Sequence, residues 1–131
     1  MLFRSPEPPV GISVPQAMYD DFVKIGEPIQ KIRPDYPFEV KVREPRKRPT
    51  RMGGTDASVF ANEGVPTLGF TTEDFKGYDF DYGEIWHTER DLYTKNIPEY
   101  QEHTATVTAI IALGVANLDK QLSREGLYTE E

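Results

Sequence analysis

Two stretches of the chain carry hydrophobic residues at the spacing of an amphipathic helix. From Gln16 to Arg33 the apolar residues recur at alternating intervals of four and three, which places them on one helix face: Met18, Phe22, Ile25, Ile29 and Ile32. Pro28 lies inside this stretch and is expected to kink the helix. From Pro98 to Leu122 a broader apolar face recurs over several turns, and proline is tolerated in the first turn. The pattern predicts two long helices, over residues 16–33 and 99–122.

Two shorter stretches have the pattern of β-strands. Residues 37–43 alternate Phe38, Val40 and Val42 with charged residues, which is typical of a half-buried strand. Residues 65–71 begin with a short apolar run, which is typical of a buried strand. We therefore expect both segments to be strands of one sheet.

A short helix is predicted between these strands. The segment ASVFANE follows Thr55 and Asp56, either of which is a good N-cap residue, and Gly64 is a natural terminator. The loop from Thr71 to Glu84 contains five acidic and four aromatic residues and is long enough to be functional. The order of helix, strand, short helix, strand, loop and long helix predicts a layered α/β fold without internal repeats.

The two ends of the chain lack a clear pattern. Residues 1–15 contain four prolines and read as an irregular lead-in outside the core. Leu2-Phe3-Arg4-Ser5 matches one translation of the end of a widely used sequencing adapter, so we expect a non-native start. Residues 123–131 are expected to be a frayed tail. The domain is therefore predicted to span residues 16–122.

Composition and charge exclude several classes of protein. The chain has 131 residues, a net charge of −7, no cysteine and no apolar run that approaches a membrane span. Residues 1–51 carry a net charge of +3 and residues 52–131 carry −10. An acidic second half argues against nucleic-acid binding there and suits a divalent cation. The basic run RKRPTR at residues 46–51 is either a partner-binding patch or, more simply, a solvated loop.

The segment EIWHTERD contains one of the two histidines of the chain. Because cysteine is absent, any metal would need histidine and carboxylate ligands. His87 is close in sequence to Glu84, Glu89 and Asp91, which could orient its ring. From these residues alone, a metal ligand and a surface or packing histidine both remain open.

Three motifs together resemble one enzyme family. The segment GGTDASVFANEGVPTLGF, then IWHTERD, then IPEYQEHTATVTAIIALGVANL are similar to the C-terminal third of the M28 family of zinc aminopeptidases. The resemblance covers roughly residues 50–122. It implies a layered α/β/α sandwich of the zinc-exopeptidase type, of which this chain would be the C-terminal part. His-Thr alone would be a weak signal, whereas three motifs in this order are a strong one.

The resemblance also implies roles for individual residues. His87 corresponds to the last zinc ligand of the family, and Asp56 corresponds to an aspartate beside the catalytic centre that does not bind metal directly. Trp86 and Thr55 correspond to positions on the substrate side. Asp91 is expected to orient the loop, and His103, which has no counterpart, is expected to be structural. As simpler alternatives, Asp56 could be a helix cap and Trp86 a core residue.

The family's activity needs groups that these motifs do not contain. It implies two zinc ions with a shared water, a glutamate as general base and a peptide substrate. One further histidine and several carboxylates come from the first two thirds of the family domain. We therefore expect a fragment of an aminopeptidase, inactive without the missing N-terminal part, with any zinc bound weakly. A glutaminyl-cyclase-like enzyme and a non-catalytic binding module are the alternatives, and many relatives are secreted or periplasmic.

Overall fold

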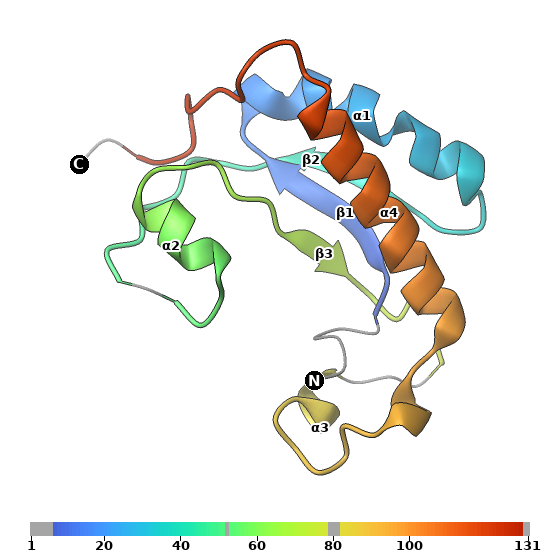
Figure 1. Cartoon of the computed structure of the whole chain (residues 1–131). Helices are drawn as coiled ribbons and strands as arrows, with labels where there is room; N and C mark the ends of the chain where they lie inside the picture. Colours follow the sequence, from blue (N-terminus) through green and yellow to red (C-terminus); the bar gives the residue numbers. More distant parts are fainter. Residues whose placement is uncertain (1–6, 52, 79–81, 130–131) are drawn as a thin grey trace.

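A small mixed sheet of three strands forms the centre of the protein. The computed structural model describes residues 7–51, 53–78 and 82–129. The central strand is β1 (Pro9–Val14), which pairs in parallel with β2 (Glu39–Val42) and antiparallel with β3 (Phe70–Thr72). The strand order is therefore β2-β1-β3, as Figure 1 shows.

Two long helices pack side by side on one face of this sheet. They are α1 (Tyr19–Ile32), which follows the 3-10 turn η1 (Gln16–Met18), and α4 (Pro98–Ala116). The two helices contact each other, α1 contacts β2, and α4 contacts β1 (Figure 1). Ile12 and Val14 of β1 are buried under them, whereas Ser13 between them is exposed. This alternation is what a strand with one covered face requires.

The remaining elements are short. They are α2 (Ala57–Asn62), α3 (Tyr82–Ile85) and the 3-10 turn η2 (Tyr93–Lys95). Gly64 follows α2 with a positive φ of 72°, the left-handed conformation in which glycine ends helices. No helix in the part of the chain that the structure describes is long and apolar enough to cross a membrane.

The sequence predicts most of this architecture. The mixed α/β class, the helix at 16–33, the short helix before Gly64 and the strand within 37–43 are confirmed. The first helix runs through Pro28 without interruption, and Ile32, predicted to lie on its buried stripe, is 58% exposed. The last helix ends at Ala116, before the predicted Leu122. The three-layer sandwich stays a prediction, because both long helices cover the same face of the sheet.

Two predictions about the ends of the chain are wrong for the residues that the structure describes. Residues 9–14, expected to be irregular, form the central strand, because Ile12 and Val14 find apolar partners on both long helices. The non-native start, residues 2–5, lies outside the described residues. The tail is not frayed at residues 127 and 128. Leu127 is buried in the core, and Tyr128 forms a β-bridge with Arg46.

The second predicted strand is also displaced. Residues 65–69 have no regular structure, and β3 begins only at Phe70. Leu68 and Phe70 nevertheless pack against the core, but the apolar run is only half-buried and most of it does not pair, so the prediction of a buried strand is wrong for residues 65–69. The antiparallel pairing with β1 starts at Phe70 opposite Ile12 and contains an irregularity between Pro9 and Gly11.

Candidate functional site

His87 stands at the apex of an exposed turn. The turn directly follows α3, and His87 has a φ of 54°, the only positive φ among the described residues other than glycines. Left-handed backbone costs a non-glycine residue roughly 1–2 kcal/mol, so the surrounding structure must hold it in place. The candidate ligand therefore occupies an enforced rather than a relaxed conformation.

Thr88 supplies much of what holds this turn. Its hydroxyl lies 2.9 Å from the carbonyl oxygen of Glu84 and 3.0 Å from that of Ile85, and it accepts a hydrogen bond from the backbone N–H of Arg90 at 3.2 Å. The backbone N–H of Thr88 also donates to Ile85. The backbone N–H of Asp91 donates to the carbonyl oxygen of Thr88, so Asp91 helps to close the turn through its main chain.

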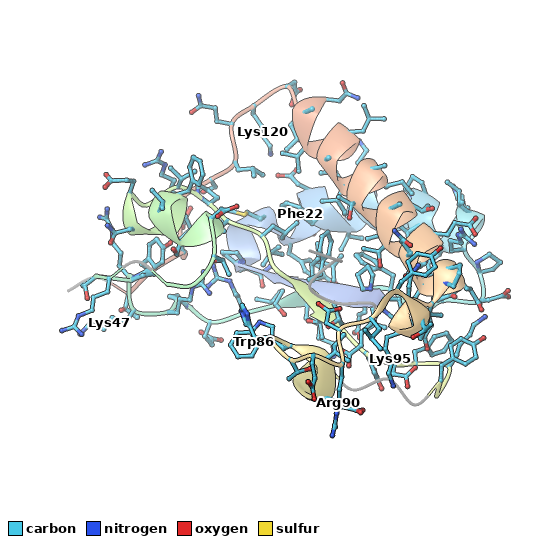
Figure 2. The ribbon with its side chains drawn as sticks, turned by 60° about the horizontal axis from the view of Figure 1, so that its bottom comes forward. Phe22, Lys47, Trp86, Arg90, Lys95 and Lys120 are labelled. Atoms are coloured by element: carbon cyan, nitrogen blue, oxygen red, sulfur yellow. The ribbon has the colours of Figure 1, made fainter. Side chains whose placement is uncertain are left out.

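Trp86 contacts His87 directly. The two ring centroids are 4.4 Å apart with an edge-to-face angle of 74°. Trp86 is 53% exposed, which argues against a core role, and Figure 2 shows it beside the α3 segment at the rim of the molecule. The neighbouring Ile85 is 6% exposed and ties this segment to the interior. An aromatic side chain thus lies beside the imidazole in an accessible place.

Asp56 and Thr55 lie on a different element. Asp56 precedes α2, and its side chain makes no cap hydrogen bond. The carbonyl oxygen of Thr55 instead accepts bonds from the backbone N–H of Ser58 at 3.0 Å and from its hydroxyl at 2.6 Å. Both Thr55 and Asp56 are exposed. Among the described residues, no hydrogen bond or ion pair joins Asp56 to His87, so their meeting at one site stays a prediction.

The described residues do not by themselves form a zinc site. A zinc ion needs at least three protein ligands, and no group of three or more histidine, aspartate or glutamate side chains comes together in residues 7–51, 53–78 and 82–129. Of the carboxylates near His87 in sequence, Glu84 pairs with Arg90 at 3.4 Å. Among the described residues, a groove of about 830 Å³ lies between α1 and α4, and a hollow of about 200 Å³ lies at the sheet; neither is lined by His87.

A second polar cluster, which the sequence did not predict, lies where the acidic aromatic loop meets the start of α4. We call it the anchor cluster; it consists of Asp74, Lys76, Tyr78, Glu99 and Tyr100. The hydroxyl of Tyr100 donates to Asp74 Oδ1 at 2.6 Å and accepts from the backbone N–H of Lys76 at 2.9 Å. The backbone N–H of Tyr78 donates to the same Asp74 oxygen at 3.0 Å.

Glu99 completes the anchor cluster. It forms an ion pair with Lys76 and accepts a hydrogen bond from the Tyr78 hydroxyl at 2.9 Å. Hydrogen bonding from Lys76, and then from its tyrosine neighbours, lowers the pKa of Glu99 to about 2. Burial and the bond to Asp74 raise the pKa of Tyr100 to about 12. These groups therefore keep one set of charges over the ordinary pH range.

Tyr36 and His103 form the floor beneath this cluster. Their rings are stacked with centroids 4.1 Å apart, and the Lys76 ammonium lies 4.8 Å from the centroid of the Tyr36 ring. His103 is fully buried, with Nε2 3.2 Å from the carbonyl oxygen of Pro9, and Nδ1 finds no hydrogen-bond partner among the described residues. Burial lowers the pKa of His103. The buried packing agrees with the structural role expected for it.

Comparison with known protein families places most of the chain in one of them. The model of peptidase family M28 matches residues 16–111, which include α1, β2, α2, the His87 turn and most of α4. No curated protein and no solved structure gives a significant match.

Proposed function

The chain belongs to peptidase family M28, and from this membership we propose that it is part of a zinc-dependent aminopeptidase that removes N-terminal residues from peptides. In this proposal His87 is one zinc ligand, and Asp56 lies beside the catalytic centre without binding metal. Trp86 and Thr55 line the substrate side. The other ligands belong to a part of the complete domain that precedes these motifs, so this chain alone is inactive.

The observation that carries the proposal is the conformation of His87 within the matched region. A non-glycine residue in a left-handed turn is uncommon. Its backbone strain persists only where the surrounding structure holds it, and such residues occur more often at functional sites. Here the turn is closed by Thr88 and the imidazole stays exposed. A packing histidine would need burial instead, which is what His103 has.

Zinc, where bound, would polarise the scissile carbonyl and supply a nucleophilic water. The described residues contribute too few ligands to support any step of that chemistry alone. What this chain supports is narrower: an exposed imidazole at the apex of a turn, with its ring centroid 4.4 Å from that of the Trp86 indole. Such an arrangement could complete a metal site whose remaining ligands approach from another segment.

A non-catalytic binding module is the second candidate, because no described group of three ligands exists. The two candidates differ in what happens when the N-terminal part of the domain is present. The aminopeptidase proposal requires zinc binding and hydrolysis in the complete protein. The module requires neither.

The test compares the 131-residue chain with a protein that carries the complete family domain, using an aminoacyl chromogenic substrate with and without a chelator. We expect chelator-sensitive hydrolysis only from the complete protein. There His87→Ala should lower kcat/KM by more than about 100-fold. Even the loss of a residue that only hydrogen-bonds to a metal ligand lowers metal affinity or activity by about 10- to 100-fold. Lys95→Ala, a change at an exposed position of η2 between the His87 turn and α4, is the matched control.

Two results would contradict the proposal. Full activity of the His87→Ala enzyme would remove His87 from the metal site. Chelator-sensitive hydrolysis by the 131-residue chain would show that the chain does not depend on missing ligands. A thermal melt of each variant separates loss of chemistry from loss of fold.

A further inference from the structure

The anchor cluster joins two segments that flank the His87 turn in the sequence. Asp74, Lys76 and Tyr78 precede the turn, and Glu99 and Tyr100 come after η2, in the first turn of α4. The hydrogen bonds of the cluster connect these two segments at several points. Whatever conformation the intervening chain adopts, its two ends are therefore held together at this place.

The connection is built on a rigid base. Tyr100 is fully buried, and its hydroxyl is shared between the Asp74 carboxylate and the Lys76 backbone, so a charged acceptor strengthens one of the two bonds. Its ring lies 5.3 Å from the ring of Tyr78 and 6.3 Å from that of Tyr36. Because α4 packs against both β1 and α1, a bond to Tyr100 is a bond to the core of the protein.

The segment between these two ends buries few side chains among its described residues. Most of residues 83–95 are exposed, including Trp86 at 53%, Leu92 at 56% and Tyr93 at 76%. The backbone hydrogen bonds from Thr88, Asp91, Leu92 and Lys95 reach residues only two or three positions away, and among the described residues Ile85 is the one buried apolar side chain of the segment. A segment with few buried contacts takes its orientation from the points where it is tied down.

We propose that the anchor cluster positions the His87 turn, with Tyr100 as the main positioning residue and Glu99 as the second. The Tyr100 hydroxyl fixes Asp74, and Glu99 fixes Lys76 and Tyr78, so both ends of the segment that carries Trp86 and His87 are set against α4. The consequence for metal binding rests on the function proposed above, whereas the effect on the segment itself does not.

The charge state of the cluster fits a permanent rather than a switched connection. The Glu99 carboxylate stays ionised because Lys76 keeps its pKa near 2, and the bond to Glu99 raises the pKa of Lys76. Tyr100 keeps its hydroxyl proton because its pKa lies near 12. The hydrogen bonds that link the two segments therefore persist under conditions in which peptidases act.

The experiment uses the 131-residue chain without metal, because Trp86 is its single tryptophan and reports on the segment directly. Tyr100→Phe removes the shared hydroxyl and keeps the aromatic ring. The rate of amide hydrogen exchange over residues 83–97 should then rise roughly tenfold, which corresponds to the free energy of one charge-assisted hydrogen bond. The fluorescence anisotropy of Trp86 should fall in the same variant.

A second variant and a matched control keep the test decisive. Glu99→Gln removes the ion pair with Lys76 at a partly exposed position and should loosen the same residues, by a smaller factor. Tyr128→Phe also removes a tyrosine hydroxyl with one hydrogen bond, to the carbonyl oxygen of Ala61. Tyr128 follows the region that matches the family model and is not part of the anchor cluster. This variant should leave the exchange of residues 83–97 and the Trp86 anisotropy as in the unchanged chain.

Unchanged exchange and anisotropy in both Tyr100→Phe and Glu99→Gln would overturn the proposal. Equal loosening of residues 83–97 in Tyr128→Phe would overturn it as well, because the effect would then be one of global stability. Failure of the aminopeptidase proposal would show in the complete protein as full activity of His87→Ala. That result would leave the exchange data of the metal-free chain untouched, so the two failures are distinguishable.

Discussion

Gly114 of α4 lies against Ile25 of α1, and an alanine there should be destabilising. A Cβ atom placed on Gly114 would overlap Cγ2 of Ile25 and lie 3.0 Å from Cγ1 and 3.1 Å from Cβ of the same residue. Isoleucine is branched at Cβ and has one strongly preferred rotamer in a helix, so its side chain cannot turn away cheaply. The two helices would have to separate.

Two opposing effects set the magnitude. Replacing glycine by alanine inside a helix is worth about 1 kcal/mol in favour of folding, whereas overpacking a close contact costs about 1–3 kcal/mol. We therefore expect Gly114→Ala to lower the free energy of unfolding by about 1 kcal/mol. In an Ile25→Ala background the overlapping atoms are gone, and Gly114→Ala should become neutral or stabilising by up to about 1 kcal/mol.

The assay is urea denaturation followed by far-UV circular dichroism on the unchanged chain, the two single variants and the double variant. Gly69→Ala is the control, since a Cβ at Gly69 would meet no atom within 4 Å. The expected coupling between Gly114 and Ile25 is about 1–2 kcal/mol, which exceeds the few tenths expected of independent sites. Additive effects would refute the reasoning that this helix contact is closed by steric fit.

Two further predictions concern β1 and the buried histidine. Gly11→Ala should lower the free energy of unfolding by about 2–3 kcal/mol, because its Cβ would lie 2.5 Å from the backbone oxygen of Glu39 and force β1 away from β2. A thermal melt like that of the unchanged chain would contradict the close pairing of β1 and β2. Burial lowers the pKa of His103 below its ordinary value, so the unfolded chain binds a proton that the folded chain does not. Its contribution to stability is therefore complete above about pH 6.5 and declines as the pH falls below that value, by at most about 1.4 kcal/mol per pH unit. Urea denaturation from pH 7.5 down to 5 measures this decline, and an equal decline in His103→Leu would exclude His103 as its cause.

Local sequence specifies the His87 turn of the candidate site but not the anchor cluster beside it. The His-Thr step predicts a place for His87, and Thr88 closes the turn with bonds to residues only three and four positions away. The anchor cluster instead joins residues more than twenty positions apart, such as Tyr100 and Asp74. The sequence placed Asp74, Lys76 and Tyr78 in an acidic and aromatic loop and Glu99 and Tyr100 in a helix. It could not join them, because a tyrosine has no sequence signal for the carboxylate that its hydroxyl meets.

The first strand shows how a local signal can be hidden. Val10, Ile12 and Val14 alternate with Gly11 and Ser13, which is the period of a strand. Prolines on both sides of this segment favour an irregular reading, since proline cannot donate to a sheet ladder. Pairing with β2 and β3, together with the burial of Ile12 and Val14 under the long helices, decided the outcome.

The sequence by itself determined the two long helices, the short helix that Gly64 ends and one strand, because each depends on the spacing of residues along a few turns or a single strand. It also carried the motifs that place the chain in its family. The tertiary structure alone decided that residues 9–14 lie at the centre of the sheet, that Leu127 returns to the core and that the loop before α3 is tied to α4. These features depend on which distant surfaces meet when the chain closes, and a local pattern specifies the face a residue occupies without specifying the partner it finds there.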